Sequence, residues 1–177
     1  EEALEWWYYT GHLQDEEGRW YGFEHVFFLM EYGGQPAVMA HHALTDDSGE
    51  TFEYNVKYGA LETSLPETGF NFSLQGLTLQ GGGGKDTLSG KAGPYALNLS
   101  LEDPNFPVVH HGNGYQAYPF GGYTYYYSRP RMTVSGTLMV GEEQRNVEGL
   151  AWFDHQWGDL TQATNQGWDW FAIQLED

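Results

Sequence analysis

The clearest structural signal in this chain is the segment VEGLAWFDHQW at residues 147–157. Successive side chains of a β-strand point to opposite faces, so a strand here would sort its residues by parity. One face would carry Val147, Ala151, Phe153, His155 and Trp157. The other face would carry Leu150, Trp152 and Asp154. The segment therefore predicts a strand with His155 on an apolar face and Asp154 on the opposite one.

Ten further β-rich runs surround this segment, and no window has a sustained helical period. Gly, Asp and Asn separate the runs where tight hairpin turns need them. We predict strands at residues 4–13, 20–31, 37–45, 52–58, 70–80, 87–92, 96–102, 122–128, 131–140, 144–157 and 168–175. The glycines at 81–84 predict a flexible loop, and the polar segment 103–118 predicts a lid or mouth loop. The pattern favours one all-β domain, an antiparallel barrel.

Composition supports a folded domain and excludes several function classes. The chain has 177 residues with 7 Trp, 13 Tyr and 10 Phe, unlike a disordered chain. Its 25 acidic and 7 basic residues give a net charge of −18, which would repel nucleic acid. The absence of Cys excludes thiolate metal sites, and adjacent histidines at 41–42 and 110–111 would point to opposite faces of a strand. We therefore expect no metal and no nucleic-acid partner.

Asp169 is a second acid that strand parity places among apolar side chains. In the predicted strand 168–175 it shares a face with Phe171, Ile173 and Leu175. Burial among aromatic rings raises the pKa of a carboxyl group, so Asp169 or Asp154 could act as a general acid, with His155 managing a water molecule. The alternative is that these groups are hydrogen-bonded residues of the core.

Aromatic side chains near these groups are candidate ligand contacts. Trp157, together with the face that carries Tyr125 and Tyr127, offers π surfaces that stabilise a developing cation by about 0.5–2 kcal/mol. Trp152 offers a further ring on the other face of its strand. An aromatic-lined interior of this kind predicts an apolar small molecule as the ligand.

Three more polar residues each have two interpretations. Glu24 and His25 lie in a run that is apolar on both faces, so they either contact a ligand or bridge neighbouring strands. Arg129 either binds the carboxylate of a ligand through a bidentate pair of hydrogen bonds or pairs with one of the many acidic residues of the chain.

Five aromatic strings resemble a known family. They are EWWYYTGHL at 5–13, YGFEHVFF at 21–28, YYYSRPR at 125–131, GLAWFDHQWG at 149–158 and GWDWF at 167–171. In order and length these strings resemble the AttH-like, carotenoid 1,2-hydratase (hydroxyneurosporene synthase) family, over nearly the whole chain. The resemblance implies a calycin, lipocalin-like barrel spanning residues 1–177. It also implies that this barrel is the first of two in tandem.

The resemblance also carries expectations about chemistry. Family members that act on carotenoid precursors protonate an isoprenoid double bond and add water, and their His-x-Trp element is matched by His155 and Trp157. Their Tyr-x-Asp element is not matched, because the nearest acid, Asp169, follows a tryptophan. A fold shared by binders and enzymes does not by itself identify the activity.

These observations lead to one main hypothesis and two alternatives. The main hypothesis is an apolar-ligand domain for a lipid or isoprenoid, with hydratase or isomerase activity that needs no cofactor. The alternatives are a lipid carrier without activity and a glycan-binding β-domain. We expect as partners the apolar ligand and either a second barrel of the same protein or another copy of it. The family resemblance implies the periplasm or cell envelope as the compartment, with the cytoplasm as the alternative.

Overall fold

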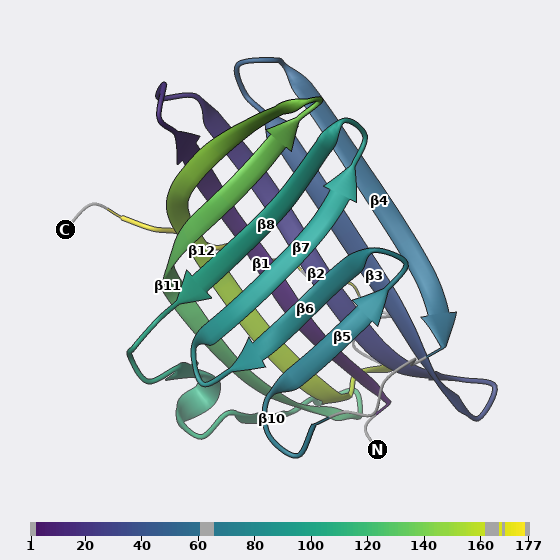
Figure 1. Ribbon diagram of the computed structural model, residues 1–177. Coiled ribbons are helices and arrows are strands. Elements are labelled where there is room, and N and C mark those ends of the chain that lie inside the picture. The colour runs from purple at the N-terminus through teal and green to yellow at the C-terminus, as the bar shows by residue number, and fades with distance from the viewer. Residues whose placement is uncertain (1–2, 61–65, 162–166, 168, 176–177) are drawn as a thin grey trace.

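The computed structural model describes residues 3–60, 66–161, 167 and 169–175 (Figure 1). Strands dominate this part of the chain: β1 (Leu4–Asp15), β2 (Trp20–Tyr32), β3 (Gln35–Asp46), β4 (Thr51–Ala60), β5 (Phe70–Leu74), β6 (Leu77–Gly82), β7 (Lys85–Ala92), β8 (Tyr95–Glu102), β9 (Val108–Val109), β10 (Tyr115–Ala117), β11 (Tyr123–Val140) and β12 (Glu143–Asp159). A single 3-10 turn, η1 (His110–Gly112), lies between β9 and β10. In the described residues, no helix is long and apolar enough to cross a bilayer.

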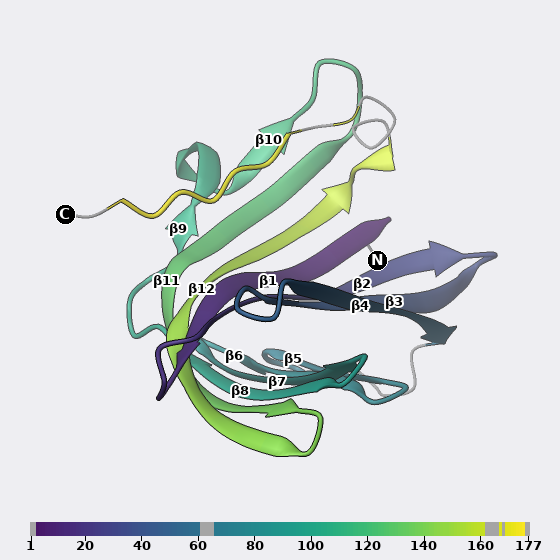
Figure 2. The same cartoon turned by 90° about the horizontal axis from the view of Figure 1, so that it is seen from above.

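The strands form one antiparallel sheet that curls into a nearly closed barrel. Its order is β4-β3-β2-β1-β12-β11-β8-β7-β6-β5, with the short β9 and β10 paired to β11. Figure 2 shows β5–β8 lying under β1–β4, while the long, curved β11 and β12 run from one layer to the other. Gln75 donates a hydrogen bond of 2.9 Å from the β5–β6 turn to the carbonyl of Tyr58 on β4, between the two ends of the sheet. The predicted all-β antiparallel barrel is confirmed.

Aromatic side chains from both layers fill the centre of the barrel. Trp7 and Phe27 pack against Phe72 with ring centroids 4.7 and 5.3 Å apart, and Tyr9 stacks on Phe153 at 4.5 Å. All five are almost fully buried, and each such ring contributes roughly 2–3 kcal/mol by leaving water. At this level the interior is occupied by the side chains of the protein itself.

Two boundaries between predicted strands were wrong. The predicted strand 70–80 is divided into β5 and β6 by a tight turn at Gln75 and Gly76, both with positive φ. The predicted strands 122–128 and 131–140 are one strand, β11, with an irregular register between Arg129 and Met132. Pro130 lies inside this bulge, where its missing N–H costs no ladder hydrogen bond. The glycines at 81–84 extend β6 and form a short turn into β7 instead of a flexible loop.

The predicted last strand, 168–175, was also wrong. Residues 169–175 have no strand conformation, and Trp168 lies outside the described residues. The physical reason is the pairing of β12, which has β1 on one edge and β11 on the other and therefore offers no free edge to a following strand. The predicted lid segment 103–118 is mainly irregular, as expected, but also contains β9, η1 and β10.

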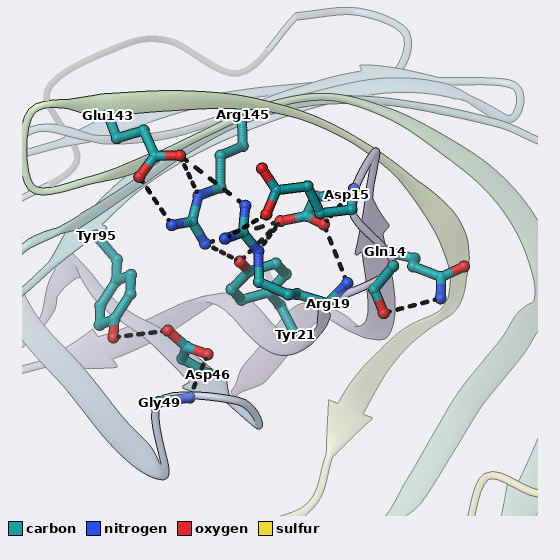
Figure 3. Close-up of polar contacts among 11 residues, drawn as sticks. Gln14, Asp15, Arg19, Tyr21, Asp46, Gly49, Tyr95, Glu143 and Arg145 are labelled. Atoms are coloured by element: carbon teal, nitrogen blue, oxygen red, sulfur yellow. Dashed lines mark hydrogen bonds and ion pairs between the residues drawn. The ribbon is translucent and has the colours of Figure 1, made fainter.

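An ion-pair network ties two turns together at one end of the barrel (Figure 3). Arg19 donates to the Asp15 carboxylate at 2.7 Å, while Arg145 donates to the Tyr21 hydroxyl and lies 3.7 Å from the same carboxylate. Burial alone would raise the pKa of Asp15, but hydrogen bonds from Arg19 and Tyr21 outweigh it and lower the pKa to about 2. Glu143 forms an additional, exposed pair with Arg145. The ionised Asp15 thus joins the β1–β2 turn to the start of β12.

A buried histidine pair joins the two layers. His25 Nδ1 lies 2.9 Å from His42 Nδ1, and His25 Nε2 lies 3.0 Å from the carbonyl oxygen of Thr78 on β6. Gly90 leaves room for this pair, since a Cβ there would lie 2.7 Å from the His42 ring. Burial lowers the pKa of His25 to about 3 and that of His42 to about 4. Both rings are therefore neutral in the folded protein near neutral pH.

The ion-pair network predicts a large effect of one substitution. Arg145→Ala should lower the free energy of unfolding by about 1.5 kcal/mol, because it removes the donor to the Tyr21 hydroxyl and one of the two cations beside Asp15, which keeps its pair with Arg19. Urea unfolding at neutral pH measures the change. Lys85→Ala is the matched control, since its pair with Glu102 is exposed and should contribute at most about 0.5 kcal/mol. Equal losses in the two variants would contradict the role assigned to the network.

The histidine pair predicts loss of stability in mild acid. An unfolded histidine has a pKa of about 6.5, above both folded values, so the unfolded chain takes up protons first as the pH falls. Stability is therefore full above about pH 6.5 and declines as the pH falls towards about 4. As the pH is lowered across this range, the urea midpoint of the double variant His25→Phe/His42→Leu should fall less steeply than that of the wild type. His12→Gln, at an exposed histidine, should keep the wild-type slope.

Candidate functional site

The end of β12 carries the candidate catalytic residues on two faces of one sheet. The register pairs Asp154 with Tyr8 of β1 and pairs His155 with Trp7. Because Trp7 belongs to the barrel core, His155 and Trp157 lie on the inner face, while Asp154 and Gln156 lie on the outer face. The opposite faces that parity predicts for His155 and Asp154 are confirmed. These two side chains cannot act together on one side of the sheet.

On the inner face, His155 is held by an acid and three rings. Its Nε2 lies 2.7 Å from the Glu5 carboxylate, and its ring stacks on Trp7 with centroids 4.7 Å apart. Tyr127 meets the imidazole edge-on at 5.2 Å, and Trp157 lies 4.5 Å away. Among the described residues, the other ring nitrogen of His155 is buried without a hydrogen-bond partner.

The predicted aromatic contacts are divided between the two faces. Tyr125 stacks on Trp157 at 5.5 Å and Tyr127 meets the same ring edge-on at 6.2 Å, so these three rings lie together on the inner face. Trp152 lies on the outer face, where its indole N–H donates a 2.8 Å hydrogen bond to Asp154. The aromatic residues that we predicted as ligand contacts therefore lie on two opposite faces of the sheet, and their contact with a ligand stays a prediction.

Asp154 is the most deeply buried acid of the outer face, at 2% exposure. One carboxylate oxygen accepts hydrogen bonds from the Ser128 hydroxyl and from Trp152. The other oxygen accepts a 2.8 Å hydrogen bond from the indole N–H of Trp170. Three donors from three segments hold this carboxylate in one orientation, as buried acids require.

Trp170 covers Asp154 because the C-terminal segment crosses the outer face of the sheet. Two of the described hydrogen bonds hold this segment, one from Trp170 to Asp154 and one of 2.7 Å from Gln174 to the carbonyl of Pro130. The Trp170 ring packs edge-on against Tyr8 at 5.3 Å. The bulge in β11 thus helps to hold the C-terminal segment over the outer face.

Beneath Trp170 lies a mainly apolar pocket of about 260 Å³. Its walls come from β1, β2, β11, β12 and the C-terminal segment: Leu4, Trp6, Tyr8, Phe28, Tyr126, Asp154, Gln156 and Trp170. A second pocket of about 290 Å³ shares Trp6, Tyr126, Gln156 and Trp170 with it, and adds His110 and Asp169 among its walls. Together they form an aromatic hollow with one buried carboxylate, which we call the outer pocket.

The phenols of the outer pocket remain protonated. Burial, followed by the charge of Glu24, raises the pKa of Tyr8 to about 12. Burial and the charge of Asp154 likewise raise the pKa of Tyr126. Burial also raises the pKa of Glu24, which the charge of His41 partly offsets. The pocket can therefore offer hydrogen-bond donors and an aromatic surface to an apolar molecule, with the buried carboxyl group of Asp154 in its wall.

The remaining predicted site residues lie away from Asp154. Asp169 is exposed and not part of a strand, so its predicted inward position was wrong; it lies in the wall of the second pocket instead. Glu24 is on the outer face, in the wall of a small separate hollow that also includes Phe52.

His25 is fully buried and both of its ring nitrogens make polar contacts, which fits the strand-bridging interpretation. Arg129 donates to the carbonyls of Asp103 and Asn105, and so belongs to the anchor of that loop.

Sequence reasoning missed several residues around Asp154: Tyr8, His110, Tyr126, Ser128 and Trp170. Parity of YYYSRPR places Tyr126 and Ser128 together, on the face opposite the tyrosines that we selected. Nothing in the sequence indicated that this second face is covered. In the described residues, no group of three or more His, Asp or Glu side chains could hold a metal ion.

Comparisons with known proteins agree with this architecture. A model of the AttH-like family matches residues 1–177. The solved structure of a protein described as an AttH from Nitrosomonas europaea is similar, with a TM-score of 0.76 and 24% identity over 89% of this chain and 52% of that one. Kievitone hydratase from Nectria haematococca has a TM-score of 0.71 and 14% identity over 87% of this chain and 48% of that one. The chain thus spans about half the length of these two structures, and no curated protein matches it.

The hydrogen bonds of Asp154 predict different costs for two substitutions. Asp154→Ala should destabilise the chain by about 3 kcal/mol, because it leaves Ser128 and two indole N–H groups without their acceptor. Asp154→Asn keeps one acceptor oxygen and should cost about 1 kcal/mol. Thermal and urea unfolding compare the two. If both variants were as stable as the wild type, the carboxylate would not hold the C-terminal segment in place.

Proposed function

Because this chain belongs to the AttH-like family, we propose that it binds a lipid or isoprenoid in the outer pocket and adds water to, or isomerises, one of its double bonds. One observation carries the proposal, the 2% exposed carboxylate of Asp154 at the wall of a pocket lined by aromatic rings. An apolar pocket with one fixed polar group is the usual form of a site for an apolar small molecule.

The proposed reaction uses Asp154 twice. As an uncharged acid it gives its proton to one carbon of the double bond, and the neighbouring carbon becomes a cation. The rings of Trp6, Tyr8 and Trp170 stabilise that cation through their π faces, by about 0.5–2 kcal/mol each. Water then bonds to the cation and returns a proton to the Asp154 carboxylate, so the acid is restored. If the cation instead gives a different proton to the Asp154 carboxylate, the double bond re-forms at a new position and the acid is again restored.

The inner face is the second place that we propose for the ligand. Support comes from the match of His155 and Trp157 to the His-x-Trp element, and from the packing of Trp7, Tyr125 and Tyr127 near them. Glu5 would orient the imidazole of His155. The packed rings around His155 leave less space there than the outer pocket offers, which is why we place the ligand first at Asp154.

The rest of the site is proposed to come from a partner. The chain spans about half of each of the two solved structures that it resembles. Tyr54 and Tyr58 of β4 are exposed on the outer face of the same sheet that forms the pocket. We propose that a second barrel of the same protein, or a second copy of this chain, covers this face and completes the wall.

Glycan binding is a second candidate function with one observation in its favour. A groove of about 1040 Å³ lies at the other end of the barrel, with Asn146, Glu148 and Gln14 among its walls. Trp20 at this groove is 44% exposed and packs against His12 at 5.5 Å. Exposed indole faces beside amides and carboxylates suit sugar rings.

Native mass spectrometry of the purified chain tests the class of ligand first. A lipid or isoprenoid should co-purify in about equal amount, and its loss in Trp6→Ala/Phe28→Ala would place it in the outer pocket. A chain that carries no passenger and gains thermal stability with oligosaccharides would overturn the lipid proposal in favour of the groove near Trp20.

Two neighbouring substitutions then decide the face at which chemistry occurs. Asp154→Asn should abolish turnover of the identified ligand while binding weakens less than tenfold, about 1.4 kcal/mol. His155→Gln, on the inner face, should leave turnover within about tenfold of the wild type. The reverse result would move the reaction to the inner face, and binding without turnover in the wild type would indicate a carrier.

A further inference from the structure

A chain of hydrogen bonds connects Asp154 to a histidine that the proposed reaction does not use. His110 Nε2 lies 2.7 Å from the Ser128 hydroxyl, and that hydroxyl donates a hydrogen bond to Asp154. Ser128 is 1% exposed, whereas His110 is only partly buried and lines the second pocket. This chain of hydrogen bonds therefore runs from the partly buried imidazole of His110 to the buried carboxyl group of Asp154.

The fold positions each of the three residues in this chain of hydrogen bonds. Ser128 and Asp154 are directly paired in the β11–β12 ladder. His110 lies in η1, which follows β9, and β9 is itself paired with β11 at Ser128. The His110 ring stacks on Tyr126 with centroids 3.9 Å apart, which sets its plane and directs Nε2 to the hydroxyl. A serine hydroxyl donates one hydrogen bond and can accept two, so Ser128 can accept from a protonated His110 Nε2 while it donates to Asp154.

We propose that His110 exchanges a proton with Asp154 through Ser128, so that the imidazole sets the protonation of the acid in the outer pocket. The inference rests on the proposed function for its purpose, because protonation of a double bond requires Asp154 to start as the uncharged acid. In the transfer, the Nε2 proton of the imidazolium moves to Ser128 while the hydroxyl proton moves to Asp154. A neutral imidazole and an uncharged carboxylic acid result, with no change in total charge.

The surroundings of His110 suit a proton donor. Burial lowers the pKa of His110, an effect that the charge of Asp154 opposes and that of His111 reinforces. A lowered pKa makes the imidazolium a better acid towards a neighbouring carboxylate. The titratable groups that face it from the packed elements are His111 on η1, Tyr118 in the loop after β10, Tyr126 on β11, Asp154 on β12 and Asp169 in the C-terminal segment.

Nuclear magnetic resonance of the ligand-free chain tests the relay without any substrate. The imidazole nitrogens of His110 and the carboxyl carbon of Asp154 are followed as the pH is lowered. In the wild type, both resonances should show the same two inflections, because strongly coupled groups titrate as a pair. Independent, single inflections at the two groups would overturn the proposal.

Variants separate a relay from simple attraction between charges. Ser128→Ala keeps both charges but removes the link, and should separate the two midpoints by about one pH unit. Ser128→Thr restores the hydroxyl and should restore the shared titration. If Ser128→Ala behaves as the wild type while Asp154→Asn alone changes His110, the coupling is purely electrostatic and the relay is refuted. His111→Gln, in the same turn, is the control that should retain the shared inflections.

Failure of the proton relay can be distinguished from failure of the proposed function. Shared titration in a chain that binds no lipid would leave the relay in place and remove only the hydration chemistry. Turnover that survives in Ser128→Ala with an unchanged pH profile would instead keep the function and remove the relay. If Ser128→Ala does not fold, the wild-type titration still overturns the relay when His110 and Asp154 show independent, single inflections.

Discussion

The antiparallel register of β12 between β1 and β11 is the constraint on which both candidate sites depend. It places Asp154 beside Tyr8 on one side and Ser128 on the other, and it places His155 beside Trp7 and Tyr127. A shift of one residue would exchange the two faces and leave a carboxylate among the core rings. Burial of the rings around Trp7 and Phe153 opposes such a shift, so the packing of the core also fixes the chemistry outside it.

The bulge around Pro130 has consequences on both faces of the sheet. On the inner side it directs Arg129 to the carbonyls of the segment that follows β8, where the long excursion towards η1 begins. On the outer side, the carbonyl of Pro130 receives Gln174 of the C-terminal segment. One irregularity in a strand thus positions the loop that carries His110 and the segment that carries Trp170.

Buried polar groups in this barrel fall into two kinds. Asp15 and the pair His25–His42 connect turns or layers, and every described contact that they make is to other parts of the framework. Asp154 differs because its partners include the segment that covers a pocket, and because its hydroxyl neighbour leads on to His110. The first kind is explained by stability. The second places an ionisable carboxyl group beside an apolar hollow, a costly arrangement that a binding or catalytic role would explain.

Much of the architecture followed from the sequence alone. The period of two in residues 147–157 predicted the strand and the opposite faces of Asp154 and His155, and the aromatic strings predicted the family. These features depend on local geometry, since parity is set by the backbone of a single strand. The split at Gln75 and the merging of β11 were missed because turns and bulges depend on pairing partners as much as on composition.

Only the tertiary structure decided which of the two faces holds a pocket. Asp169 was misplaced because a strand after β12 needs a free edge, and whether an edge is free depends on the pairing of residues far apart in the chain. Trp170, Ser128 and His110 reach Asp154 from segments separated from it by 16, 26 and 44 residues. Local periodicity determines where a side chain points, whereas the approach of distant segments determines what it meets there.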